Sequence, residues 1–220
     1  MNKLNLDYHK YLTSKLPENV IKKTIHNNSN FIIDNEKGFM LDIYTKLLND
    51  RIIFLTDEID TYSSELVKSQ LLYLEQLDSK KDIKMYINSP GGSVYDGLGI
   101  IDTMDFIKPD VITINTGLAA SMAAVILCYG SKGKRKSLKR ARTMIHQPMS
   151  GSYGTYQASD ITIDAKEINT LKSELYEIIS EKTGQNIKKV EQDADRDYWM
   201  NSKEAKDYGI IDEVIKPRNK

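Results

Sequence analysis

The sequence has a single cysteine in 220 residues, which excludes an intrachain disulfide and any metal site built from several thiolates. Cys128 lies in an apolar run without a cationic neighbour, so we expect a buried and unreactive thiol. The longest apolar run, 118–129, is far shorter than the about 20 residues that a membrane-spanning helix needs. The N-terminus has no apolar signal segment. These absences predict a soluble, cytoplasmic protein with no membrane partner.

Neither sign of charge is in excess, because 31 basic residues balance 31 acidic ones. A local basic cluster lies between residues 132 and 142, and no aromatic residues are interleaved in it for stacking on bases. We therefore interpret the cluster as a solvated face and expect no nucleic-acid partner. With 40% hydrophobic residues, a chain of this length can bury one sizeable core, so a single domain is expected.

Apolar runs of strand length alternate with segments of helical periodicity, which is the pattern of an α/β domain. The segment 88–93 has the composition of a turn. One face of the first long helix is predicted to carry Leu66, Leu71, Leu74 and Leu77. We predict strands over 51–55, 83–87, 111–114 and 210–215, and helices over 62–77, 94–104, 120–128, 161–182 and 203–208.

Ser121 is a hydroxyl among small apolar residues, placed just beyond a predicted strand and near the start of a predicted helix. A serine is a poor nucleophile unless an imidazole takes its proton and a carboxylate orients that imidazole. His9 and His26 lie in a polar N-terminal segment, whereas His146 ends a short apolar run and is the credible partner. Spacing from His146 leaves three candidates for the carboxylate, which are Asp193, Asp195 and Asp197.

Four short motifs carry a family resemblance. They are Asn-Ser-Pro-Gly-Gly at 88–92, Gly-Leu-Ala-Ala-Ser-Met at 117–122, Met-Ile-His-Gln-Pro at 144–148 and Asp-Arg-Asp at 195–197. Each motif alone is weak, but their order and approximate spacing are those of the proteolytic subunits of Clp proteases, the ClpP family. The chain resembles this family over about residues 31–216.

The resemblance implies an α/β fold of the ClpP/crotonase type, with repeated β-β-α/β-α units and a protruding long handle helix. It implies one serine peptidase domain over 31–220, with the handle region at about 150–182. Residues 1–30 form an N-terminal extension, for which a propeptide, a flexible arm and an ordered adaptor remain open. A strand at 151–157 would line the peptide substrate.

The resemblance also assigns roles at the site. Ser121 would be the nucleophile and His146 the general base of a serine endopeptidase that forms an acyl-enzyme. Among the three acids, the match of Arg196 and Asp197 to the family's Arg-Asp pair favours Asp197. The backbone N–H groups implied for the oxyanion hole are those of Gly92 and Met122.

The implied assembly is a homo-oligomer of two stacked heptameric rings. Its implied partners are an ATPase unfoldase of the ClpX, ClpA or ClpC type, which would consume the ATP, and unfolded polypeptide substrates. No metal or organic cofactor is implied for this chain. Arg196 would form an ion pair between rings, and the unfoldase would dock on Tyr86, Phe106 and Ile114.

Three residues depart from the family pattern. Ala123 stands where glycine usually follows Ser-Met, and Thr116 and Lys136 occupy docking positions that are usually apolar. Two other functions therefore stay open, a noncatalytic ring subunit of a mixed Clp assembly and an acyl-CoA enzyme of the crotonase type, which would not need the three side chains. Trp199, beside the acidic motif, is interpreted as a core residue.

Overall fold

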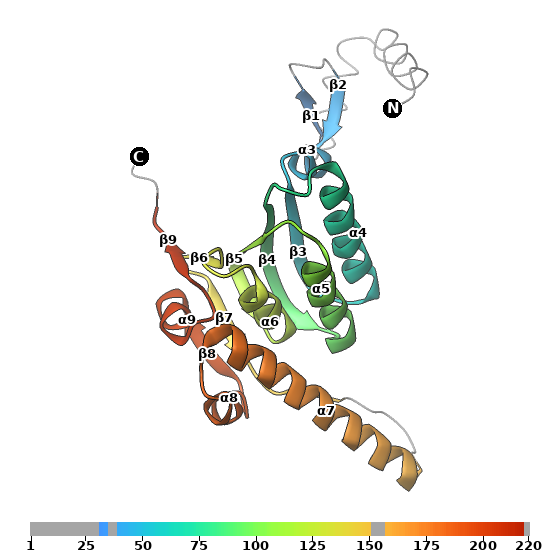
Figure 1. Cartoon of the computed structure of the whole chain (residues 1–220), viewed down its shortest axis with the longest axis vertical. Coiled ribbons are helices and arrows are strands. Elements are labelled where there is room, and N and C mark those ends of the chain that lie inside the picture. The colour runs from blue at the N-terminus through green and yellow to red at the C-terminus, as the bar shows by residue number, and fades with distance from the viewer. Residues whose placement is uncertain (1–30, 35–38, 151–156, 218–220) are drawn as a thin grey trace. The chain divides into compact units, whose positions relative to one another are not determined.

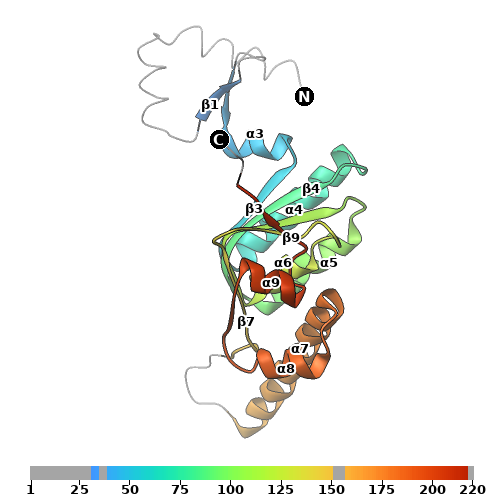
Figure 2. The same cartoon turned by 90° about the vertical axis from the view of Figure 1, so that its left-hand side faces the viewer.

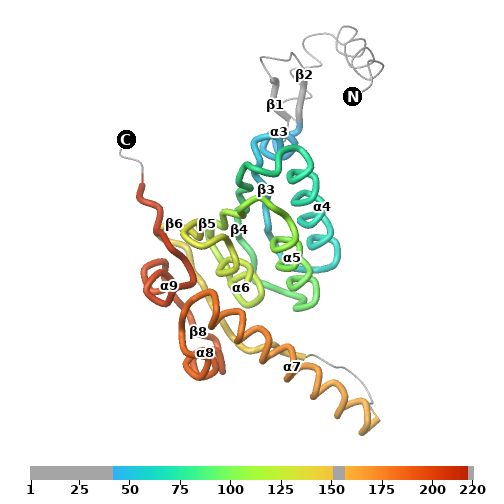
Figure 3. Tube along the Cα trace, in the orientation of Figure 1, coloured from blue at the N-terminus to red at the C-terminus, as the bar shows by residue number. Residues whose placement is uncertain are grey.

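The computed structural model describes residues 31–34, 39–150 and 157–217, and these fall into two compact units that divide between Arg51 and Ile52. In the first unit, β1 (Phe31–Asp34) pairs antiparallel with β2 (Phe39–Asp42), and α3 (Ile43–Asn49) follows. The extension predicted at 1–30 lies outside the described residues, so the boundary at residue 30 stays a prediction. The traces in Figures 1 and 3 follow this order of elements.

The second unit is built on a twisted, mostly parallel sheet. Its strands run in the order β3, β4, β5, β6, β9, and all four pairings along this path are parallel. Along β5 the pairing partner changes from β6 to β7, which pairs in parallel with the carboxyl end of β5. The strand β7 in turn pairs antiparallel with β8. The seven strands are β3 (Ile52–Ile59), β4 (Ile83–Gly92), β5 (Val111–Ala120), β6 (Lys136–Leu138), β7 (Arg142–Ile145), β8 (Tyr198–Asn201) and β9 (Glu213–Ile215).

Three helices cover one face of this sheet, as Figure 1 shows: α4 (Thr61–Leu77), α5 (Val94–Phe106) and α6 (Met122–Tyr129). The β4 side chains of Ile83, Met85 and Ile87 point into this layer and are fully buried. The remaining helices are α7 (Ala158–Thr183), α8 (Ile187–Asp193) and α9 (Ser202–Tyr208). The predicted α/β class and its protruding helix are confirmed.

The helix α4 begins at a capping box, in which the carboxylate of Asp60 accepts a hydrogen bond from the Ser63 N–H at 2.7 Å. The predicted apolar face is only half right, because Leu66 and Leu77 are exposed. The face that packs on the sheet follows a different spacing of three and four residues. Its buried members are Ser64, Val67, Leu71 and Leu74.

Most of the turn predicted over 88–93 is instead the last part of β4, which continues through Gly92, and Ser93 is the N-cap of α5. The register of β4 with β5 shifts between Ile87 and Ser89 of β4. The register of β3 with β4 shifts between Thr56 and Glu58 of β3. Residues typical of turns thus mark irregular strand pairing at this point. In the same way β5 continues to residue 120, and the helix predicted from 120 begins at 122.

The long helix α7 confirms the predicted handle helix, and it ends where Gly184 adopts a left-handed conformation with φ 75°. Its second half packs through Leu175, Tyr176 and Ile179, whereas Ile161 and Ile163 in its first half are exposed. Figure 2 shows α7 extending past the sheet. The predicted substrate strand at 151–157 lies almost wholly outside the described residues. None of the helices described is long and apolar enough to cross a bilayer.

Candidate active site

Ser121 is the one residue between β5 and α6. Its N–H donates to the carbonyl of Met144 on β7 at 2.9 Å, and its own carbonyl accepts from the Ala124 N–H at 2.9 Å in the first turn of α6. The backbone has φ 52° and ψ −127°, a region that costs a non-glycine residue about 1–3 kcal/mol. The fold thus holds this serine in a strained conformation at the junction of a strand and a helix.

His146 and Asp197 face each other at one end of the β7–β8 ladder. The last register pair is Ile145 with Tyr198, so the next residues outward are His146 and Asp197. The Nδ1 atom of His146 lies 3.1 Å from Oδ1 of Asp197. The imidazole is 12% exposed and the carboxylate 59% exposed. With Nδ1 turned to the acid, Nε2 is the nitrogen left for proton transfer.

The two other acidic candidates have different partners. Asp193 accepts a hydrogen bond from Lys189 on α8 at 2.5 Å, and Asp195 accepts from the amide of Gln147 at 3.2 Å. Of the three carboxylates that sequence spacing left open, only Asp197 is hydrogen-bonded to His146 in the described parts of the chain. The antiparallel pairing of β7 with β8 brings Asp197 to His146, and this neighbourhood cannot be derived from the spacing of the residues along the chain.

Ser121 and His146 lie at the ends of neighbouring strands, because Ala120 pairs with Met144 in the β5–β7 register. Within the described residues no hydrogen bond joins the Ser121 hydroxyl to the imidazole. Catalytic hydrogen bonds are often long in unliganded sites and tighten when substrate is bound. Ser121, His146 and Asp197 therefore share one edge of the sheet. The contact between His146 and Asp197 is formed there, and in the described part of the chain the hydrogen bond between Ser121 and His146 is not.

Two glycines at the end of β4 pass close to this edge. A Cβ atom on Gly91 would lie 2.7 Å from the Ser121 Cβ and 3.0 Å from the Met122 nitrogen. A Cβ atom on Gly92 would lie 2.2 Å from the carbonyl oxygen of Ile59 on β3. Sequence reasoning named Gly92 and Met122 and missed Gly91. The signal available was the Gly-Gly pair itself, since two glycines in a strand mark close backbone approach.

Trp199 is 53% exposed, so its interpretation as a core residue is wrong. Side chains alternate along β8, and it is the following residue, Met200, that points inward and is buried. An exposed tryptophan thus stands two residues from Asp197. It was missed as a surface feature because a large aromatic residue is more often buried than exposed.

Of the predicted docking residues, Tyr86 and Ile114 are register partners on β4 and β5 and lie on the sheet face opposite the helices. The Tyr86 ring also contacts Phe54, with ring centroids 5.7 Å apart. Phe106 is separated from them, because it ends α5 on the helical face, where it is 77% exposed. Beside Ile114 in the register stands Lys136, which pairs with Glu213 at 2.8 Å.

The basic cluster at 132–142 is more than a solvated face. Lys134 bridges two carboxylates and holds the pKa of one of them, Asp110, below its usual range. Arg135 is buried and forms two hydrogen bonds with the Asp212 carboxylate, at 2.6 and 2.9 Å. Arg196, in contrast, is exposed and has no ion pair in the described part of the chain.

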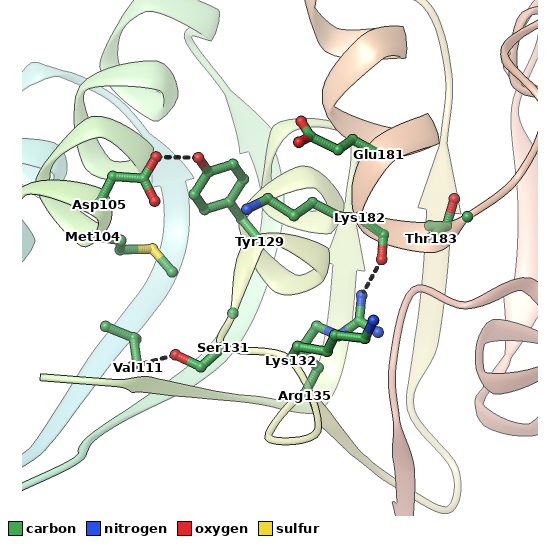
Figure 4. Close-up of a pocket in the computed structure, with 12 residues that line it drawn as sticks. Met104, Asp105, Val111, Tyr129, Ser131, Lys132, Arg135, Glu181, Lys182 and Thr183 are labelled. Atoms are coloured by element: carbon green, nitrogen blue, oxygen red, sulfur yellow. Dashed lines mark hydrogen bonds between the residues drawn. The ribbon is translucent and has the colours of Figure 1, made fainter.

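A cavity of about 440 Å³ lies away from this edge, where α5, α6 and α7 end (Figure 4). In it the Tyr129 hydroxyl donates to Asp105, and the Lys182 ammonium lies 3.7 Å from the centre of the Tyr129 ring. None of the proposed catalytic side chains lines it. Among the residues described, no group of three or more His, Cys, Asp or Glu side chains could hold a metal ion.

Comparisons with known proteins agree on one family. The sequence profile of the Clp protease family matches residues 35–218. Two similar proteins, each named ATP-dependent Clp protease proteolytic subunit, come from Bacteroides fragilis and Bacteroides thetaiotaomicron. They are 52% and 51% identical over 217 residues, which is 95% of this chain and 98% of each relative. The ATP-dependent Clp protease proteolytic subunit 2 of Synechococcus is 55% identical over 183 residues, 83% of this chain and 91% of the relative.

Proposed function

Because this chain belongs to the Clp protease family, we propose that Ser121, His146 and Asp197 carry out its serine endopeptidase chemistry. The observation that supports the assignment is the 3.1 Å contact between His146 and Asp197, formed at the edge of the sheet where Ser121 follows the neighbouring strand β5. A serine, a histidine and a carboxylate in this relation can form and hydrolyse an acyl-enzyme.

In the first half of the reaction, the Ser121 Oγ attacks the peptide carbonyl carbon while Nε2 of His146 takes the hydroxyl proton. Asp197 stabilises the imidazolium through Nδ1. The proton then passes from Nε2 to the leaving amine as the C–N bond breaks. In the second half, Nε2 of His146 takes a proton from the water that attacks the acyl-enzyme, and this proton passes to the Ser121 Oγ as the ester C–O bond breaks and the product leaves with its new carboxyl group.

The negative oxygen of each tetrahedral intermediate needs hydrogen-bond donors. We assign them to the backbone N–H groups of Gly92, at the end of β4, and of Met122, which follows Ser121 in the chain. Met122 is the first residue of α6, so its N–H belongs to the positive end of a helix. Losing one such donor typically lowers the rate by about 100- to 1,000-fold. Neither step uses a metal or an organic cofactor.

The partners proposed for the chain are those of an ATP-dependent Clp protease, namely copies of itself and an ATPase unfoldase that delivers unfolded polypeptides. We propose two stacked heptameric rings and a cytoplasmic location. Tyr86 and Ile114 lie on one face of the sheet and Phe106 ends a helix on the other. A docking pocket that used all three would therefore combine the faces of two adjacent copies, which is compatible with a ring.

Hydrolysis of a short fluorogenic peptide tests the assignment, with the assembly state recorded by sedimentation velocity in the same sample. We expect activity from assembled wild type and none above background from Ser121→Ala, with the assembly unchanged. Covalent labelling by a serine-reactive phosphonate should map to Ser121. An assembled wild type that neither cleaves nor is labelled would instead indicate a noncatalytic ring subunit.

A further inference from the structure

Gln147 follows the proposed base and makes contacts that the mechanism above does not use. Its backbone N–H donates to the carbonyl of Ala194 at 2.6 Å. Its side-chain Nε2 donates to the next carbonyl, that of Asp195, at 2.7 Å, and to the Asp195 carboxylate at 3.2 Å. The segment 194–196 leads directly into Asp197. One residue adjacent to the base thus holds two successive carbonyls of the segment that carries the acid.

The remaining polar atom of Gln147 is held by the handle helix. The Lys172 ammonium on α7 donates to Oε1 at 3.1 Å. In an amide only the oxygen accepts and only the nitrogen donates, so a cation at Oε1 determines which end faces Asp195. Both side chains are partly buried, and a hydrogen bond from a charged donor is about twice as strong as a neutral one. Lys172 therefore fixes the orientation of the amide.

A second contact from α7 reaches the same segment. The buried Tyr176, one turn beyond Lys172, places its hydroxyl 3.4 Å from the Ala194 carbonyl. The Lys172 ammonium also lies 5.6 Å from the centre of the Tyr176 ring. Lys172 thus contacts Gln147, which follows the proposed base, and Tyr176 contacts Ala194, in the segment that leads to the proposed acid.

We infer that Gln147 is a positioning residue for the pair of His146 and Asp197, and that Lys172 acts through it. The inference rests on the proposed function, because the base and the acid are those assigned there. The path runs from the ammonium to the amide, from the amide to the carbonyl of residue 195, and from there along the chain to the acid. Misplacing a catalytic group by about 1 Å can cost about 100-fold in rate.

The first experiment changes Lys172 and compares kcat with KM for the fluorogenic peptide, on assembled protein isolated by size exclusion. Lys172→Met removes the donor, and we expect kcat to fall about tenfold while KM stays constant, as for an interaction that serves the chemical step. Lys172→Arg keeps a charged donor and should restore most of the rate. Lys166→Met is the matched control, an exposed lysine of the same helix, and should behave as wild type.

The second experiment changes the amide. Gln147→Glu keeps an oxygen for Lys172 but replaces the donor to Asp195 with another carboxylate oxygen, so it should be slower than Lys172→Met. Gln147→Ala breaks both contacts. Because the two residues act in series, the double variant Gln147→Ala/Lys172→Met should be no slower than Gln147→Ala alone.

Three results would overturn the inference: wild-type kcat in Lys172→Met, an arginine variant no faster than the methionine variant, or single effects that multiply in the double variant. Failure of the proposed function has a different signature, because wild type would then show no Ser121-dependent hydrolysis. Phosphonate labelling rates of the same variants give a second readout and should follow kcat.

Discussion

At Gly91 the backbone of β4 approaches Ser121, the proposed nucleophile, too closely for any side chain. A Cβ atom there would lie 2.6 Å from the carbonyl oxygen of Ala120 and 2.7 Å from the Ser121 Cβ, and the residue has φ 93°. We expect Gly91→Ala to lower kcat by more than about 100-fold, because the strand-to-helix turn must move. It should also lower the free energy of unfolding by about 1–3 kcal/mol. Peptide hydrolysis and urea unfolding measure the two effects.

Gly133 provides the matched control, since it has φ 80° but no atom within 4 Å of a built Cβ. Gly133→Ala should show the backbone cost alone, about 1 kcal/mol, with wild-type kcat. Equal loss of activity in both variants would contradict the steric account of Gly91.

Single residues show where sequence reasoning succeeds and where it stops. Ser121 could be selected from the sequence because it lies among small apolar residues, and His146 because the two other histidines lie in a polar N-terminal segment. The carboxylate partner of His146 could not be chosen by spacing, because the contact between His146 and Asp197 depends on pairing between strands more than 50 residues apart. The strain at Ser121 was equally hidden, since φ at a serine depends on the strand and helix that it joins. Trp199 was misjudged because its side of β8 was unknown.

At the scale of elements, Arg135 joins parts of the fold that are distant in sequence. Its guanidinium donates to the Asp212 carboxylate before β9, to the Cys128 carbonyl near the end of α6 at 3.2 Å, and to the Lys182 carbonyl near the end of α7 at 2.8 Å. Carbonyls in the last turn of a helix have no partner within the helix, so one cation completes two helix ends. The helix α6, which follows Ser121, is thereby tied to α7, the handle helix.

The pair of Arg135 with Asp212 predicts that the stability of the protein depends on pH. Burial raises the pKa of Asp212, but the hydrogen bonds from Arg135 outweigh it and hold that pKa below its ordinary value of about 3.9. A carboxyl with a lowered pKa in the folded state stabilises the protein above the unfolded value, and this contribution is lost as pH falls through the folded value. Wild type should therefore lose stability below about pH 4.

Urea unfolding at pH 7 and at stepwise lower pH measures this contribution. Asp212→Asn should be less stable at pH 7 and should lose less on acidification than wild type. Glu213→Gln is the control, because its pair with Lys136 is exposed and such pairs contribute about 0–1 kcal/mol. Parallel pH curves for wild type and Asp212→Asn would contradict the assignment.

Long elements with clear periodicity could be predicted from the sequence, as α4 and α7 show. The short strands β6, β7 and β8 could not, because three or four residues carry too little pattern and owe their structure to their neighbours in the sheet. The proline and the glycines of the segment 88–93 favour a turn when the sequence is read alone. In the sheet these residues accommodate a register shift, which no local rule distinguishes from a turn.

At the scale of the whole molecule, Arg196 offers a test of assembly. Its side chain is exposed and has no ion pair in the part of the chain that the structure describes, although it adjoins Asp197. If it pairs with another copy, Arg196→Ala should raise the protein concentration needed for assembly about tenfold, which corresponds to about 1.4 kcal/mol. Sedimentation velocity over a dilution series measures this. Peptidase activity should fall with the assembled fraction.

Arg140→Ala removes an exposed arginine elsewhere and should assemble as wild type does. An Arg196 variant that assembles normally would remove this residue from the interface. The sequence alone could name the residue through resemblance but could not supply its partner, because the contact lies between copies.

The thiol of Cys128 is a built-in probe of how often the core opens. Cys128 is fully buried, and burial raises its pKa to about 12, so an alkylating reagent can reach a thiolate only when the core opens. Because the chain has no other cysteine, each molecule takes up one label. The rate of labelling in native buffer therefore reports how often the core around α6 opens, and it does so in the unaltered protein, without an introduced probe.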